Sequence, residues 1–115
     1  MTSKIISWNI RGLNEAGKMV GVQNLLREWR PDLVCLQETK LEVVSRDIVS
    51  SLWGGQHVGF QSVGSSGASG GILIMWDTRV FDMEEVREGS FSLLISFRNI
   101  EDSFRWMFIG VFGLM

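Results

Sequence analysis

Two polar side chains, Asn9 and Glu38, each follow a short apolar stretch and are candidates for chemistry. Asn9 ends the stretch KIISWN just before a turn at Gly12, and Glu38 directly follows LVCLQ. A carboxylate that leaves a buried strand has a rigid support, and hard cations such as Mg²⁺ bind carboxylate and amide oxygens. The Asn9 amide can add an oxygen or a hydrogen-bond donor beside it. These two side chains therefore predict part of a metal site for Mg²⁺, with Mn²⁺ as a substitute.

The elements that position these two residues read as strand, helix and strand. Lys4–Asn9 is rich in β-branched residues and ends at glycine, which predicts a strand. Apolar residues then recur three or four positions apart between Met19 and Trp29, which predicts an amphipathic helix that Pro31 ends. Leu33–Glu38 is nearly continuous in apolar residues, as in a strand covered on both faces. If the two strands run parallel, Asn9 and Glu38 lie at the same edge of the sheet.

The rest of the chain adds more strands than helices. Spacing four from Val44 to Leu52 predicts a short helix, closed by glycines. The glycine- and serine-rich segment Gly64–Gly71 is interpreted as a mobile loop in preference to a binding loop, because its composition cannot bury enough apolar surface to order it. It also lacks the Gly-Lys-Ser/Thr ending of a phosphate loop. Strands are predicted at residues 57–63, 71–76, 91–98 and 104–112. The fold class is therefore α/β, a mixed sheet or layered sandwich.

Composition places the chain among globular proteins. Its 115 residues are 45% hydrophobic and 21% charged, which predicts one domain over residues 1–115. The net charge of −2 gives no overall positive field for nucleic acid, so phosphate binding must be local. One cysteine, Cys35, and no secretory pattern at the start favour an intracellular setting, nucleus or cytoplasm. No apolar run is long enough to span a membrane, so we expect no membrane partner.

Four motifs together resemble the endonuclease/exonuclease/phosphatase family, which has the DNase-I-like fold. They are SWNIRGLN from Ser7, LQETK from Leu36, GGILIMWD from Gly70 and WMFIGVFG from Trp106. The amino-acid sequences of these motifs are most similar to those in the endonuclease domains of plant LINE-type (non-LTR) retrotransposons. The resemblance implies the N-terminal half of a four-layer α/β sandwich and a Mg²⁺-dependent nuclease that acts on DNA. It also implies that Glu38 binds Mg²⁺, that Asn9 orders phosphate and metal, and that Lys40 supports the carboxylate.

The chain departs from this family pattern in three places. Phe112 stands where the family usually has a tyrosine that contacts phosphate, and the sequence has no tyrosine. The family's Gly-Asp-Phe-Asn motif, with the aspartate that activates water, and its Ser-Asp-His motif would lie beyond Met115. His57 matches neither. We therefore expect a truncated domain that is inactive alone, and whether it is an enzyme stays open. The alternative is a non-catalytic remnant or interaction module that self-associates through an uncovered apolar face.

Each candidate also has a purely structural interpretation. Asn9 could cap the turn that follows it, Glu38 could be a solvent-exposed strand-end carboxylate, and Lys40 could be a surface charge. For Arg11 the structural interpretation is preferred. Cys35, in a buried strand, is expected to be inert, and His57 structural. No catalytic or binding role is predicted for three tryptophans expected in the core: Trp29, Trp76 and Trp106. The same holds for an acidic run expected to face solvent: Asp82, Glu84, Glu85 and Glu88.

Overall fold

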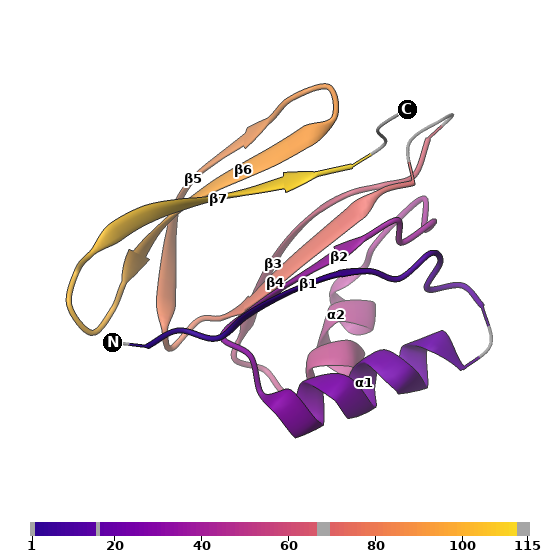
Figure 1. Cartoon of the computed structure of the whole chain (residues 1–115), viewed down its shortest axis with the longest axis horizontal. Helices are drawn as coiled ribbons and strands as arrows, with labels where there is room; N and C mark the ends of the chain where they lie inside the picture. Colours follow the sequence, from indigo (N-terminus) through magenta and orange to yellow (C-terminus); the bar gives the residue numbers. More distant parts are fainter. Residues whose placement is uncertain (1, 16, 67–69, 113–115) are drawn as a thin grey trace.

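The computed structural model describes residues 2–15, 17–66 and 70–112, which form three stacked layers. Two helices cover one face of a first sheet, and a second sheet covers the other face (Figure 1). The predicted α/β class with a mixed sheet is confirmed. The segment 64–71 lies partly outside the described residues, so its interpretation as a mobile loop is not addressed at residues 67–69.

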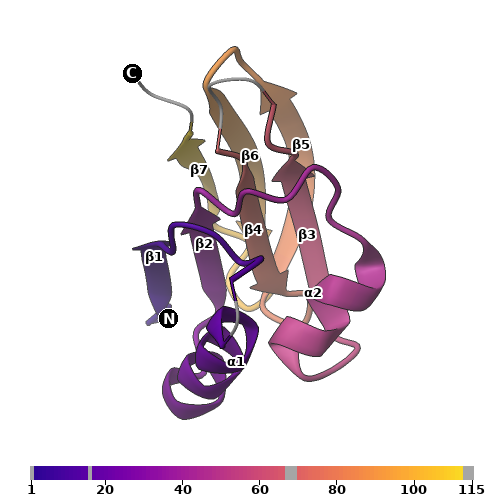
Figure 2. The ribbon, with the colours of Figure 1, turned by 90° about the vertical axis from the view of Figure 1, so that its right-hand side faces the viewer.

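The first sheet contains the strands that carry Asn9 and precede Glu38. Its order within the described residues is β1 (Ile5–Asn9), β2 (Leu33–Gln37), β4 (Ile72–Asp77) and β3 (Val58–Val63), as Figure 2 shows. β1 and β2 are parallel, whereas β4 is antiparallel to both of its neighbours. β2 and β4 are buried along almost their whole length because they have a layer on each side. The prediction that residues 71–76 form a central strand is confirmed.

Helix α1 (Lys18–Trp29) and helix α2 (Arg46–Trp53) form the outer layer. α1 has Gly17 at its N-cap without a side-chain hydrogen bond, and it ends at Arg30, directly before Pro31. α2 has a side-chain N-cap, because Ser45 Oγ accepts a hydrogen bond of 3.2 Å from the backbone N–H of Ile48. Both helices turn apolar residues toward the first sheet. Trp29, expected in the core, is 52% exposed at the end of α1, and that expectation was wrong.

The second sheet contains β5 (Phe81–Glu88), β6 (Ser92–Asn99) and β7 (Arg105–Val111) in that order. The sequence did not predict β5. A register shift between Met83 and Glu85 breaks the alternation of the strand, and most of its side chains are exposed. Its acidic residues pair across the sheet, as in the Arg98–Asp82 ion pair of 2.7 Å. Pairing with a neighbour, not an apolar pattern, makes this segment a strand.

The two sheets meet in an apolar core and approach closely at Gly110. A Cβ at Gly110 would lie 2.5 Å from Ile72 Cδ1 and 3.4 Å from Cys35 Sγ, so a side chain there would require the Ile72 side chain to shift. The core between the sheets consists of Leu33, Cys35, Ile72, Ile74, Trp76, Phe81, Leu93, Ile95, Phe97 and Phe112. Burial of this face holds the second sheet against the first.

The outer face of β7 has no covering layer among the described residues. Met107 is 64% exposed, Ile109 56% and Val111 40%, whereas Trp106 and Phe108 turn inward. The apolar run 104–112 is therefore buried on one side only. In the described ranges, no helix is long and apolar enough to cross a bilayer.

Candidate functional site

Asn9 and Glu38 lie at the same edge of the first sheet. The parallel register pairs Asn9 with Gln37, so Glu38 is the next residue beyond the paired ends of β1 and β2. The pairing continues past the strands, because the N–H of Ile10 donates to the Gln37 carbonyl at 3.1 Å and the N–H of Gly12 donates to the Glu38 carbonyl at 2.7 Å. The expected parallel pairing is therefore confirmed.

The backbone around Glu38 adopts left-handed conformations that ordinary residues rarely adopt. Glu38 has φ 55° and Lys40 φ 57°, and Arg11 has φ 52° in the neighbouring loop. Each costs on the order of 1–3 kcal/mol and persists only where surrounding contacts enforce it. Here the N–H of Glu38 donates to the Gly71 carbonyl at 3.0 Å, and the N–H of Lys40 donates to the Gly70 carbonyl at 2.7 Å. The segment 38–40 is thus clamped between two loops.

The Asn9 side chain caps its own turn. Its Oδ1 accepts a hydrogen bond of 3.2 Å from the backbone N–H of Arg11, which is the structural interpretation considered for this residue. An amide oxygen has two lone pairs, so this bond leaves acceptor capacity for a second partner. Asn9 is exposed at the sheet edge. The cap and a ligand role are therefore compatible.

The Glu38 carboxylate is half-buried and forms no ion pair within the part of the chain that the structure describes. Lys40 is exposed, two residues along the same loop, and it forms no ion pair with Glu38 in those residues either. The support that the resemblance implies for Lys40 is not present there as an ion pair. A carboxylate without an ion-pair partner in these ranges is available to a cation.

These donors fit a sparse Mg²⁺ site. Among the described residues, no three His, Cys, Asp or Glu side chains come together, so a site closed by protein ligands alone is absent there. Mg²⁺ commonly keeps several waters and takes one or two carboxylates together with substrate phosphate. The Glu38 carboxylate and the Asn9 amide oxygen suit that ion by ligand type and by their common edge.

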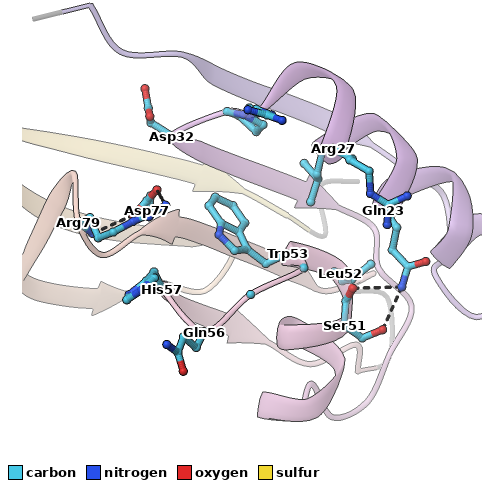
Figure 3. Close-up of a pocket in the computed structure, with 15 residues that line it drawn as sticks. Gln23, Arg27, Asp32, Ser51, Leu52, Trp53, Gln56, His57, Asp77 and Arg79 are labelled. Atoms are coloured by element: carbon cyan, nitrogen blue, oxygen red, sulfur yellow. Dashed lines mark hydrogen bonds and ion pairs between the residues drawn. The ribbon is translucent and has the colours of Figure 1, made fainter.

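A cavity lies at the opposite end of the first sheet. Its volume is about 510 Å³, and its lining includes Asp32 before β2, His57 before β3 and Asp77 at the end of β4 (Figure 3). Arg79 donates from Nε and Nη2 to the Asp77 carboxylate at 3.0 and 2.9 Å, and these bonds lower the pKa of Asp77. Because this cavity lies at the other end of the strands, it does not supply further groups to the edge that carries Glu38.

The interpretation of Cys35 as an inert core residue is supported by its surroundings. The thiol is free and buried between the two sheets. Burial raises its pKa to about 12, and a hydrogen bond with Ser7 opposes that effect only in part. The thiolate is the reactive form, so this cysteine carries no chemistry at neutral pH.

The comparisons with known proteins agree with this geometry. The model of the "Endonuclease/Exonuclease/phosphatase family" matches residues 6–110, nearly the whole chain. The chain belongs to the endonuclease/exonuclease/phosphatase family. It superposes on the crystal structure of an AP endonuclease from Leishmania major with a TM-score of 0.65 at 21% identity, covering 95% of this chain and 39% of that one. An exodeoxyribonuclease of Bacillus subtilis (strain 168) is 41% identical over 39 residues, 34% of this chain and 16% of that protein.

This chain therefore spans well under half the length of the relatives that it matches, and it represents a fragment of the family fold. Phe112, which takes the place of a tyrosine expected by resemblance, is buried in the core between the sheets and has no hydroxyl to offer. The comparisons with these relatives do not assign a role to Asn9 or Glu38.

Sequence reasoning singled out the motifs that contain Thr39, Gly70 and Gly71 but did not predict that these residues surround Glu38. Thr39 is fully buried, and its Oγ1 is the buried side-chain polar atom without a hydrogen-bond partner in the described ranges. Gly70 and Gly71 accept the two hydrogen bonds that hold the Glu38 loop. The pair of glycines directly before an apolar strand was the available signal, because glycine there indicates a close backbone approach.

Proposed function

We propose that this chain is the metal-binding part of a Mg²⁺-dependent phosphodiesterase domain of the nucleic-acid endonuclease type. Glu38 would hold the cation, and Asn9 would orient the phosphate or a metal-bound water beside it. The observation that carries this proposal is the parallel pairing of β1 and β2, which brings both side chains to one edge. The Glu38 carboxylate, which has no ion-pair partner among the described residues, supports it further.

Each side chain has a distinct part in the proposed site. A bound Mg²⁺ supplies positive charge that polarises the scissile phosphate. Glu38 binds and fixes that charge, since its carboxylate stands on a clamped loop and not on a free one. Asn9, already held by the bond from Arg11, has a defined amide orientation toward the same edge. Mn²⁺ prefers the same oxygen ligands and would substitute.

The isolated 115-residue chain is expected to be inactive or nearly so. The patterns Gly-Asp-Phe-Asn and Ser-Asp-His do not occur in its sequence. Its one histidine, His57, lies at the opposite end of the first sheet. Absence of a general base typically costs ~10²–10⁴ in rate, and loss of electrostatic stabilisers a comparable factor.

A nicking assay on supercoiled DNA tests this proposal together with direct metal binding. We expect the chain to bind Mn²⁺, detected by electron paramagnetic resonance, and to lose that binding in Glu38→Gln, while nicking stays at background with Mg²⁺ in both proteins. Robust nicking that Glu38→Ala removes would show that the fragment is competent. Equal Mn²⁺ binding by wild type and Glu38→Gln would contradict the metal role.

Origin, nucleic-acid partner and cellular location are proposed from the amino-acid sequences of the four motifs alone. We propose a plant LINE-type retrotransposon origin, DNA as the partner of the complete domain, and a place in the nucleus or cytoplasm. We also propose that the complete domain is a four-layer sandwich, in which a further helical layer covers the outer face of β7. A Gly-Asp-Phe-Asn pattern in the genomic sequence downstream of the codon for Met115 would support this assignment, and a continuous unrelated sequence there would count against it.

A non-catalytic interaction module is the second candidate, and the exposed face of β7 favours it. Met107, Ile109 and Val111 present apolar side chains to solvent on a strand at the sheet edge. Analytical ultracentrifugation separates the two candidates. Concentration-dependent association without Glu38-dependent Mn²⁺ binding would favour the module, whereas a monomer that binds Mn²⁺ would favour the nuclease fragment.

A further inference from the structure

Gly70 lies directly against the stem of the Glu38 side chain. A Cβ added at Gly70 would be 3.1 Å from Glu38 Cγ, 3.2 Å from its Cα and 3.3 Å from its Cβ. These separations are shorter than ordinary van der Waals contact between carbon atoms. A side chain at position 70 would therefore crowd the first two carbons of the Glu38 side chain, and glycine leaves them the room that they occupy.

The backbone of the same glycine pair fixes the main chain of Glu38. The carbonyls of Gly71 and Gly70 accept hydrogen bonds from the N–H groups of Glu38 and Lys40, at 3.0 and 2.7 Å. Both donors belong to residues with positive φ. On the other side, the N–H of Gly12 donates to the Glu38 carbonyl at 2.7 Å. Hydrogen bonds to the Gly70–Gly71 segment on one side and from Gly12 on the other thus fix the backbone conformation at Glu38.

We propose that Gly70 is a positioning residue that fixes the rotamer of Glu38, an inference that rests on the proposed metal role of that carboxylate. Gly70 is not among the glycines with a left-handed φ, so no positive φ requires glycine at this position. The requirement for glycine at this position is the close approach of Glu38. Gly71 differs, because its φ of 83° alone makes any substitution strained.

Gly70→Ala adds one methyl group at this contact, where no positive φ requires glycine. We expect the three-bond couplings of the Glu38 side chain, measured by NMR, to report one χ1 rotamer in the wild type and a changed or averaged rotamer in the variant. Mn²⁺ affinity should fall about 10-fold, the lower end of the effect of losing support for a ligand. The full 115-residue chain is used throughout.

Gly55→Ala is the matched control, because no described atom lies within 4 Å of a Cβ at Gly55 and its φ is not left-handed. Both Glu38 couplings and Mn²⁺ affinity should be unchanged in it. If Gly70→Ala fails to fold, the double variant Gly70→Ala with Glu38→Gly removes Cβ and Cγ, two of the three Glu38 atoms that the methyl group meets, and suits the positive φ. Recovery of the native amide spectrum in the double variant supports the inference, and continued failure to fold overturns it.

The two proposals fail in different ways. Unchanged Glu38 couplings in a folded Gly70→Ala variant, or an averaged rotamer in the wild type, would overturn the positioning role while leaving Glu38-dependent Mn²⁺ binding intact. Absence of Glu38-dependent Mn²⁺ binding in the wild type would instead overturn the metal role and, with it, the purpose assigned to the contact.

Discussion

Glu38 differs from several other acidic side chains in lacking a cationic partner within the described ranges. Asp77 is bound by Arg79, Asp82 by Arg98 and Glu84 by Arg105, with contacts of 2.7–3.0 Å. Exposed pairs of this kind each add little stability, but they neutralise the carboxylate and make it a poorer ligand. Glu38, without such a pair, keeps its charge available on a clamped loop.

Cys35 provides a prediction on reactivity and pH at the scale of one residue. Its folded pKa of about 12 lies above the ordinary value of 9.0, so the thiol stays protonated in the native state while the unfolded chain ionises. The stabilising contribution is complete below pH 9 and is lost as pH rises toward 12. At pH 10 the loss is about 1.4 kcal/mol.

Urea unfolding at pH 8 and pH 10 measures this effect, with Cys35→Ala as the comparison. The wild type should lose about 1.4 kcal/mol more than the variant between these pH values. A thiol reagent at pH 8 should modify Cys35 only after denaturation. Rapid modification of the native protein would show that the cysteine is more accessible than its place between the sheets implies.

Thr39 provides a second prediction at this scale. Its buried hydroxyl has no partner among the described residues, and a buried unsatisfied polar group costs about 1–3 kcal/mol. Thr39→Val keeps the shape and replaces the hydroxyl by a methyl group, so we expect the free energy of unfolding to rise by about 1 kcal/mol. The exposed Thr78→Val is the control in denaturant titrations. A marked loss of stability would indicate that the hydroxyl bonds a group in the folded protein.

At the scale of elements, glycines in the two layers differ in what surrounds them. Gly21 lies inside α1 with no described atom within 4 Å of an added Cβ, whereas a Cβ at Gly59 of β3 would lie 2.5 Å from the Trp76 indole. The first glycine only weakens a helix that already lacks a side-chain N-cap. The second is required by packing.

Gly21→Ala is therefore expected to stabilise the protein by about 0.5–1 kcal/mol, because alanine loses less conformational entropy in a helix. Gly59→Ala is expected to destabilise it by about 1–3 kcal/mol through overpacking against Trp76. Thermal and chemical unfolding of the two variants measure the contrast. Stabilisation by both substitutions would mean that the Trp76 ring moves aside at little cost.

At the scale of the whole molecule, the second sheet is covered on its inner face and, among the described residues, open on its outer face. This asymmetry is consistent with the length of the chain relative to its family, since it covers 39% of the AP endonuclease on which it superposes. The apolar side chains of β7 form the open surface together with the half-buried Leu94 of β6. Such surfaces associate with one another or with a partner.

We expect the isolated chain to self-associate at high concentration, and Ile109→Lys to reduce that association, because a charge at the centre of the strip opposes its burial. Val20→Lys is the matched control, since Val20 is an equally exposed apolar residue on α1, away from this sheet. Sedimentation velocity at several concentrations measures the effect. An equal response to both substitutions would exclude the outer face of β7 as the contact.

The sequence by itself determined the local elements and the edge that carries the candidate site. Periodicity and glycine placement predicted β1, α1, β2 and β4, because each pattern depends on burial of a face that recurs along the chain. The position of Asn9 and Glu38 at strand ends then followed from the strand–helix–strand order. The family resemblance of four motifs was confirmed by the match over residues 6–110.

Only the tertiary structure decided what depends on a neighbour from elsewhere in the chain. β5 is a strand because β6 pairs with it, and Trp29, the last residue of α1, is exposed although it continues the apolar spacing of the helix. The contact between Gly70 and Glu38 joins residues that are distant in sequence, so the glycine pair could indicate a close approach but not its partner. Side-chain periodicity records which face is buried, whereas cross-strand pairing and close approach exist only after the layers have assembled.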